Sequence, residues 1–234
     1  MSKAARCAYI YNNAENASGT HARRAVVGGG AVGVEVAGEL AANHTVTLTA
    51  REDELVRDLP EAARRYALEA LRSKNVRVEL SKHEEERGSF DARVECYGAR
   101  PRTGWLATFV DRDARGFVRV DDHCRTSMDN VWAAGDCVAK NADQYLAAYA
   151  HFEGEYVASM VASEILGKAP PGAYVAPPRI VALALGPDDG VLCYGRFVVL
   201  SGRAVPWVKA LVERWVVRLW PLPYALFCRL PALA

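Results

Sequence analysis

The sequence predicts an α/β protein in which parallel strands alternate with helices, followed by a small β-hairpin and an amphipathic helix. Two observations lead to this fold class. Short β-branched runs alternate with helical segments from residue 24 to residue 80. Farther along, Pro, Asp and Gly residues at 186–190 separate two apolar runs, which is typical of a tight chain reversal.

The alternating segments can be assigned in chain order. Strands are expected at 24–27, 45–50 and 76–80, and helices at 32–43 and 59–75. Strand, helix, strand, helix, strand is the order of a doubly wound unit. We therefore expect a parallel sheet in the first third of the chain.

The middle of the chain gives weaker signals. Strands are expected within 116–122 and 129–136, and a long helix within 141–167 that ends at Gly167 before a pair of prolines. The prolines at 170 and 171 indicate a domain boundary.

Composition excludes several classes of protein. The 234 residues are 51% apolar and 24% charged with a net charge of +1, so we expect a globular chain that binds no nucleic acid. The six cysteines form no C-x-x-C pair, and the five histidines show no metal-ligand spacing, so we propose no metal. The N-terminus has no apolar run like that of a signal peptide, and we expect an intracellular location, cytoplasmic or mitochondrial.

Three glycines follow the first predicted strand in the pattern G-x-G-x-x-G. Gly28 permits a tight turn, Gly30 removes a side chain that would block a pyrophosphate, and Gly33 lets helix and strand pack closely. The helix that opens there presents unpaired N–H groups and a positive dipole to an anion. Because the glycine motif lies between a predicted strand and a predicted helix, it predicts a Rossmann-like β-α-β unit that binds NAD(P)H.

The end of the second strand bears on which nucleotide binds. An acidic residue there would accept the ribose hydroxyls of NADH, whereas this chain has Ala50 followed by Arg51. An arginine can pair with the 2′-phosphate of NADPH, while Glu52 and Asp53 could still serve NADH. Arg51 could equally be a solvated surface side chain.

The stretch "VVGGGAVGVEVAGEL" resembles the NAD(P)H-binding fingerprint of the FAD-dependent pyridine nucleotide-disulfide oxidoreductase superfamily. It is most similar to its apoptosis-inducing-factor-like branch, which includes ferroptosis suppressor protein, and to type II NADH dehydrogenases. The resemblance implies that Glu35 lies near the nicotinamide.

Two later segments extend the resemblance. "VECYGARPRTGWL", with Gly98, is similar to the family's "ATG-x-x-P-N-T" segment, and "VDDHCRTSMDNVWAAGDCV" resembles its "N-V-Y-A-x-G-D" signature. The resemblance implies that Gly135 and Asp136 contact FAD. It also implies that the helix beyond approaches flavin and quinone, although Glu153 stands where many type II enzymes have glutamine.

Two parts of the family pattern are missing from this sequence. Relatives carry an earlier Rossmann half with its own G-x-G-x-x-G for the ADP of FAD, and here only 23 residues precede the first strand. Relatives also insert a three-stranded meander where this chain has only the charged connector before "ARVECYG".

Together these observations divide the chain into four parts. They are a polar N-terminal segment, an NAD(P)H-binding domain, a remnant of an FAD-binding Rossmann-like domain and a C-terminal α+β domain, at 1–22, 23–98, 99–170 and 171–234.

The C-terminal domain ends in a predicted amphipathic helix at 205–220, with Leu211 and Trp215 among its apolar residues. It could pack on the β-hairpin, or residues 204–220 could lie on a membrane surface.

The sequence thus predicts an oxidoreductase that passes electrons from NAD(P)H through FAD to a quinone-like acceptor. Hydride passes directly between the two cofactors, so no catalytic side chain is required. The alternatives are a non-catalytic relative that binds nucleotide, a membrane or a partner, and a split enzyme whose FAD half is on a second polypeptide.

Overall fold

The computed structural model describes residues 22–82, 90–98, 100–141 and 146–218. Nearly all of the predicted polar segment 1–22, and the end of the predicted C-terminal helix at 219–220, lie outside these residues. The chain forms two compact units. Of the described residues, unit 1 comprises those within 22–98 together with 179–218, and unit 2 comprises those within 100–178.

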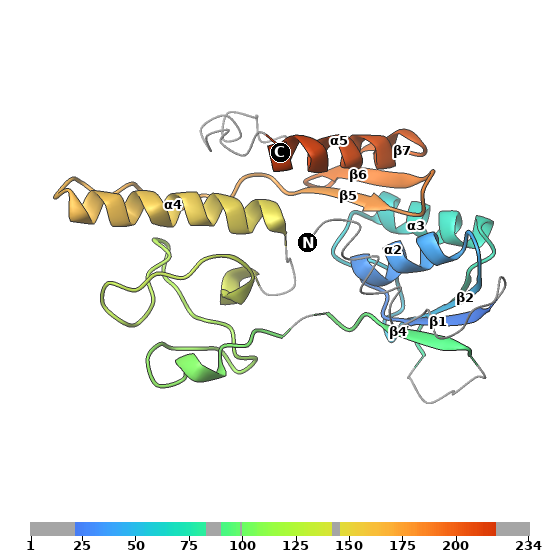
Figure 1. The fold of residues 1–234 in the computed structure, drawn as a ribbon, viewed down its shortest axis with the longest axis horizontal. Helices are drawn as coiled ribbons and strands as arrows, with labels where there is room; N and C mark the ends of the chain where they lie inside the picture. Colours follow the sequence, from blue (N-terminus) through green and yellow to red (C-terminus); the bar gives the residue numbers. More distant parts are fainter. Residues whose placement is uncertain (1–21, 83–89, 99, 142–145, 219–234) are drawn as a thin grey trace. The chain divides into compact units, whose positions relative to one another are not determined.

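Unit 1 contains the predicted parallel sheet, which has the strand order β3-β2-β1-β4. Figure 1 labels three of these strands, β1, β2 and β4. The strands are β1 (Arg23–Val27), β2 (Thr45–Thr49), β3 (Arg77–Glu79) and β4 (Ala92–Glu95). Two helices connect the first three of them, α2 (Ala31–Leu40) and α3 (Glu61–Ser73). The α/β fold class is confirmed, and β1 lies between β2 and β4 with parallel pairing on both sides.

A second, antiparallel sheet lies in the same unit. It consists of β5 (Ile180–Ala184), β6 (Gly190–Tyr194) and β7 (Phe197–Ser201), and α5 (Ala204–Arg218) follows it. The predicted hairpin is confirmed, because β5 and β6 pair across the turn at 185–189. The third strand, β7, comes in addition to that hairpin.

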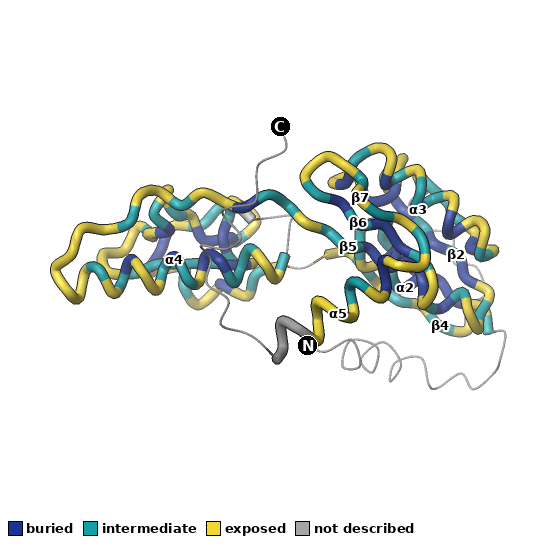
Figure 2. Tube along the Cα trace, turned by 90° about the horizontal axis from the view of Figure 1, so that it is seen from above, coloured by how far each residue is buried: buried dark blue, intermediate teal, exposed yellow. Residues whose placement is uncertain are grey.

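One apolar core joins the two sheets of unit 1. Its buried residues include Val26, Leu48 and Leu71 from the parallel-sheet layer, and Leu183 and Val191 from β5 and β6. The sequence division assigned 171–234 to a domain of its own, whereas the structure packs 179–218 onto the unit of 23–98. Figure 2 shows the buried residues continuing from α2 and α3 into β5 and β6.

Unit 2 is built on the long helix α4 (Ala147–Ile165) and three short 3-10 helices. The 3-10 helices are η1 (Gly104–Leu106), η2 (Gly135–Cys137) and η3 (Ala139–Asn141). No strand forms in the described part of this unit, so the strands predicted within 116–122 and 129–136 are wrong; only isolated bridges such as Val118 with Val138 occur.

Aspartate side chains close turns at both ends of the first predicted strand, 116–122. Asp113 Oδ1 accepts the backbone N–H groups of Arg115 and Phe117, both at 2.9 Å or less. Asp121 Oδ1 does the same for His123 and Arg125, at 2.8 Å each. The bond to Phe117 occupies a donor at the start of the first predicted strand, and the bonds to Arg115, His123 and Arg125 favour turns before and after it.

Within the described residues, no helix is both long and apolar enough to cross a bilayer.

Candidate functional site

The glycine turn lies at the carboxyl end of β1, where two of its glycines are required by packing. Gly28 has φ +123°, and a Cβ added there would lie 2.8 Å from the carbonyl carbon of Cys96, the residue after β4. A Cβ on Gly33 would overlap the carbonyl oxygen of Gly28 and lie 3.0 Å from its carbonyl carbon. Both positions therefore exclude any side chain, as predicted from the sequence.

Gly30 differs from these two. It is the N-cap of α2 with φ −76° and ψ 178°, which any residue can adopt, and a Cβ there would meet no atom within 4 Å. The space in front of Gly30 is therefore open. The first N–H groups of α2 have no partner within the helix, and no acidic residue lies in its first turn. An open approach to a helix N-terminus suits a phosphate group.

The order of the strands places this turn at the usual ligand position of such sheets. The chain leaves β1 toward β2 through α2, and β4 returns on the opposite side of β1. Ligands of open α/β sheets bind at the carboxyl ends of the strands where the strand order reverses. Here that point lies between Gly28 and Cys96.

The segment after β2 packs beneath the glycine turn. The backbone N–H of Val56 donates to the carbonyl oxygen of Gly29 at 2.8 Å, and Leu55, Val56 and Leu59 are buried. A Cβ on Gly29 would lie 2.7 Å from the Cβ of Ala50, so this contact is close. The loop 51–59 is thus held against the dinucleotide turn.

Two arginines of this loop, Arg51 and Arg57, are exposed. Arg51 is 74% exposed, and its guanidinium lies 3.7 Å from Glu52. Arg57 is 61% exposed, and its Nε lies 3.9 Å from Asp53. Solvated ion pairs at such long N···O distances contribute little to stability. Both guanidinium groups can therefore bind another anion.

Glu35 lies in α2 and points to the C-terminal part of unit 1. Its Oε1 accepts the backbone N–H of Ala184 at 3.1 Å and the ammonium of Lys209 at 2.5 Å. Both side chains are about four-fifths buried, at 21% and 24% exposure. Glu35 is therefore held by β5 and α5.

The predicted site residues divide between the two units. Gly28, Gly30, Gly33, Glu35, Arg51 and Gly98 belong to unit 1, and Gly135 and Asp136 belong to unit 2. Gly98 has φ +85°, and a Cβ there would meet no atom within 4 Å.

A buried carboxylate, that of Glu153 on α4, fixes the turn at Gly135 and Asp136. Gly135 is buried with φ +79°, whereas Asp136 is exposed. The Oε2 of Glu153, which is 1% exposed, accepts the Gly135 N–H at 2.7 Å. Lys140 Nζ lies 3.5 Å from Glu153 Oε1 and compensates its charge. Glu153 thus fixes the backbone that presents Asp136.

The described cysteines are unpaired, and their thiols are weakly acidic. Burial raises the pKa of Cys96 to about 11, and desolvation also raises the pKa values of Cys124, Cys137 and Cys193. At neutral pH these groups are thiols, which are poor nucleophiles. Within the described residues, no group of three or more His, Cys, Asp and Glu side chains gathers as metal ligands would.

The sequence did not predict the roles of three residues at this site, Arg57, Lys209 and Glu153. Arg57 lies in a loop without periodicity, and Lys209 meets Glu35 across 174 positions of sequence. Glu153 replaces a glutamine of many type II enzymes, but this difference in sequence does not show its bond to Gly135. The signal that could have identified Glu153 as a buried, paired group is its helical spacing of three and seven residues from the apolar Tyr156 and Met160.

The parallel sheet, the glycine turn at the strand reversal and the open helix N-terminus define an α/β protein of the dinucleotide-binding class. A comparison with protein families makes this more specific. Residues 5–152 match the family model described as pyridine nucleotide-disulphide oxidoreductase, and the chain belongs to this family. The family and the fold confirm the superfamily predicted from the fingerprint, whereas the predicted branch within it stays a prediction.

Curated relatives agree with this family. A dihydrolipoyl dehydrogenase from Pseudomonas aeruginosa is 32% identical over 189 residues, which cover 71% of this chain and 40% of that protein. An NADH dehydrogenase from Bacillus subtilis is 33% identical over 144 residues, 52% of this chain and 27% of its own. The chain spans less than half the length of these relatives.

Solved structures share the fold. An engineered water-forming NADPH oxidase bound to NADPH has a TM-score of 0.62 at 24% identity, covering 82% of this chain and 45% of that one. An FAD-dependent pyridine nucleotide-disulphide oxidoreductase from Desulfovibrio vulgaris has a TM-score of 0.60 at 18% identity, covering 79% and 52%.

Proposed function

We propose that the chain is the NAD(P)H-binding part of an FAD-dependent oxidoreductase that passes electrons to a quinone-like acceptor. The observation that carries this proposal is the open space at Gly30, at the N-terminus of α2 and at the reversal point of the sheet. Gly28 and Gly33 are glycines because the protein fills the space around them, whereas Gly30 leaves room for a ligand. A pyrophosphate fits this arrangement.

Different described residues would bind different parts of the two cofactors. The α2 N-terminus would hold the pyrophosphate, and the loop 51–59 would hold the adenosine end. Asp136, fixed through Gly135 by Glu153, would face FAD. FAD, when bound, supplies the acceptor of the hydride, so the protein's own task is alignment of the two cofactors.

Among the two nicotinamide nucleotides, the arginines of the loop favour NADPH. The engineered NADPH oxidase is described as a variant in which consecutive Asp and Ala residues became Ala and Arg, and a Pro six positions after that Arg became a second Arg. This chain has Ala50, Arg51 and Arg57 at the same spacing. Two exposed guanidinium groups suit the doubly charged 2′-phosphate. The two chains differ at the next position: that variant has a serine directly after its first arginine, whereas this chain has Glu52 after Arg51.

Fluorescence titration with NADPH and NADH tests this proposal. Removing one guanidinium with Arg51→Ala or Arg57→Ala should weaken NADPH binding about tenfold or more, the value of one charge-assisted hydrogen bond, and leave NADH within about twofold. Arg77→Ala is the matched control, because Arg77 is 77% exposed and pairs with a neighbouring carboxylate. Equal affinities of all three variants for NADPH would refute the assignment of the phosphate site.

The flavin and acceptor parts of the proposal need a separate experiment. Purified protein reconstituted with FAD should show a flavin absorption band that NADPH bleaches under anaerobic conditions and a quinone restores. NADPH binding without any flavin band would support a nucleotide-binding module, and a band that needs a second polypeptide would support a split enzyme.

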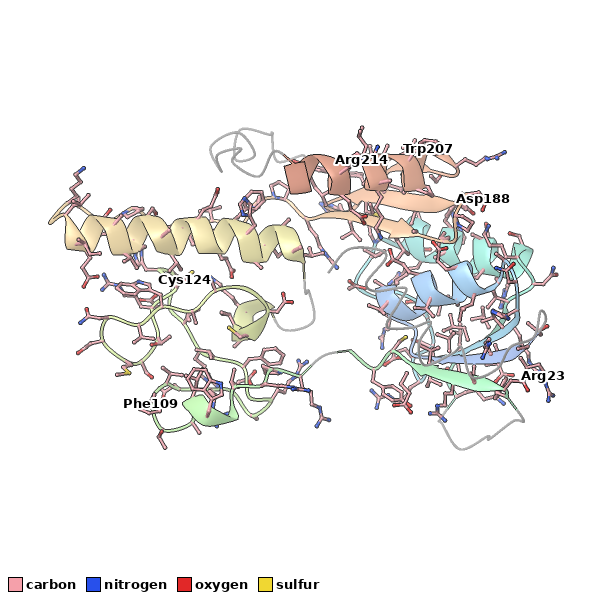
Figure 3. The ribbon with its side chains drawn as sticks, in the orientation of Figure 1. Arg23, Phe109, Cys124, Asp188, Trp207 and Arg214 are labelled. Atoms are coloured by element: carbon pink, nitrogen blue, oxygen red, sulfur yellow. The ribbon has the colours of Figure 1, made fainter. Side chains whose placement is uncertain are left out.

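A peripheral membrane contact is a second candidate, supported by the exposure of α5. Trp207 is 80% exposed, Leu211 67% and Val212 51%. Arg214, which Figure 3 labels on α5 together with Trp207, is also exposed and could meet anionic headgroups. Vesicles of anionic lipid should sediment the chain, and Trp207→Ser combined with Leu211→Ser should abolish this. Sedimentation unchanged by the two substitutions would contradict the contact.

A further inference from the structure

The contact between Glu35 and Lys209 joins the proposed nucleotide helix to the C-terminal helix. Glu35 is five residues past Gly30 on α2, which is about 7.5 Å along the helix axis from the N-terminus. A carboxylate displaced by this axial distance from a bound pyrophosphate opposes its binding, since like charges repel over distances of about 8 Å when the ionic strength is low. The effect depends on whether the carboxylate is compensated.

Lys209 provides this compensation in a fixed geometry. Its ammonium contacts Glu35 Oε1 at 2.5 Å, and the N–H of Ala184 donates to the same oxygen. Lys209 lies directly before residues 210–214, which are all exposed, so it is placed where α5 leaves the packed part of unit 1. Figure 2 shows this change along α5 from buried to exposed.

A second contact holds the same part of the chain on α2. A Cβ added to Gly38 would lie 2.5 Å from the carbonyl carbon of Leu185 and 2.8 Å from the nitrogen of Gly186. The backbone after β5 therefore touches the backbone of α2, and only glycine permits this approach. The C-terminal segment thus has a fixed position relative to α2, and the partner of Glu35 has one too.

We propose that Lys209 is a positioning residue of the nucleotide site, which neutralises Glu35 and thereby lets α2 accept the pyrophosphate. The C-terminal helix is then part of the binding site for the dinucleotide. This inference rests on the proposed function, because it assumes that a dinucleotide phosphate binds at Gly30. The ligand chemistry is a phosphate anion.

Titration with NADPH at low ionic strength tests the role of Lys209. Lys209→Met should weaken NADPH binding about fivefold, which is the effect of one added negative charge roughly 8 Å from a doubly charged group in a water-like dielectric. In approximately 1 M salt the difference should shrink to less than about twofold, because the Debye length falls to about 3 Å. A purely structural role of Lys209 would give no such salt dependence.

The chain offers a matched control. Lys74 makes a comparable ion pair with Asp188 at 2.8 Å, and it also joins the parallel-sheet layer to the β5–β6 turn. Lys74→Met should leave NADPH affinity within about twofold of wild type.

The pair of substitutions Glu35→Gln and Lys209→Met provides the decisive measurement. The double variant leaves no uncompensated charge, so it should fold and should bind NADPH more tightly than Lys209→Met does. A double variant that binds as weakly as Lys209→Met, or a Lys209→Met variant that binds like wild type, would overturn the inference. Failure of the wild type to bind NADPH would instead overturn the proposed function, and the inference with it.

Discussion

Replacing Gly30 with alanine separates the requirements of the ligand from those of the fold. The backbone of Gly30, at φ −76° and ψ 178°, is available to alanine, and the added Cβ would meet no atom within 4 Å. Replacing glycine with alanine at an N-cap lowers the free energy of unfolding by up to about 1 kcal/mol. Alanine also restricts the unfolded chain, which offsets about 0.4–1 kcal/mol of this loss. We expect the free energy of unfolding to change by less than about 1 kcal/mol.

The same methyl group should interfere with nucleotide binding. It would occupy the open space at the N-terminus of α2, where a phosphate oxygen must approach the backbone N–H groups. Loss of one hydrogen bond to a charged group costs about 1.5–3 kcal/mol, so we expect NADPH affinity to fall about ten- to hundredfold.

Urea denaturation and NADPH titration of the same preparation measure both effects. Gly154→Ala is the matched control, because a Cβ there also meets no atom within 4 Å and Gly154 lies within α4, away from the glycine turn. That control should keep NADPH affinity and gain up to about 1 kcal/mol from helix propensity. Undiminished NADPH binding by Gly30→Ala, or a loss of stability above about 2 kcal/mol, would refute this account of Gly30.

Two further predictions concern residues around the same turn. Gly33→Ala should destabilise the chain by about 3 kcal/mol, because its Cβ would overlap the carbonyl of Gly28, and urea denaturation should show the loss even without nucleotide; a stability equal to that of Gly30→Ala would contradict this. Because burial raises the pKa of Cys96 to about 11, its alkylation by iodoacetamide, followed by mass spectrometry, should be slow at pH 7 and accelerate up to pH 11. The folded state keeps the Cys96 proton at a pH where the unfolded chain loses it, so this thiol also makes stability fall as pH rises from about 9 toward 11. An alkylation rate that levels off near pH 8 would show an ordinary thiol.

The parallel sheet and the glycine turn could be predicted because their signals are local. The period of the β-branched runs and the spacing of Gly28, Gly30 and Gly33 depend on neighbouring residues only. The structure confirms strands in all three predicted places; Gly28 has the positive φ of a turn, and Gly33 has a close contact.

Local signals were misleading in unit 2. The runs around Val118 and Val131 have strand-like composition, but positive φ occurs at Gly116, where the first run begins, at Cys124 between the runs and at Asn130 in the second. The side chain of Asp121 then closes a turn between the two runs. Strand propensity depends on available pairing partners, and here the backbone donors have local acceptors.

The placement of the C-terminal segment could not be predicted, because the contacts that hold it are far apart in sequence. Arg179 pairs with Asp58, Tyr66 OH donates to Asp189 Oδ1 at 2.7 Å, and Lys74 pairs with Asp188. None of these pairs has a periodic or motif signal. The shared apolar core could not be predicted from sequence either, because the apolar run in β5 does not show which surface it will cover.

These contacts change the meaning of the domain boundary near Pro170. The prolines separate α4 from β5 along the chain, but the segment beyond them completes the core of the nucleotide-binding unit. Residues 23–98 alone would expose the apolar surface that Leu183 and Val191 cover, and Glu35 would lose both of its partners. A fragment ending at residue 98 therefore lacks part of its fold and part of its proposed site. The complete nucleotide turn and the partners of Glu35 are together contained in the described residues of 22–98 and 179–218.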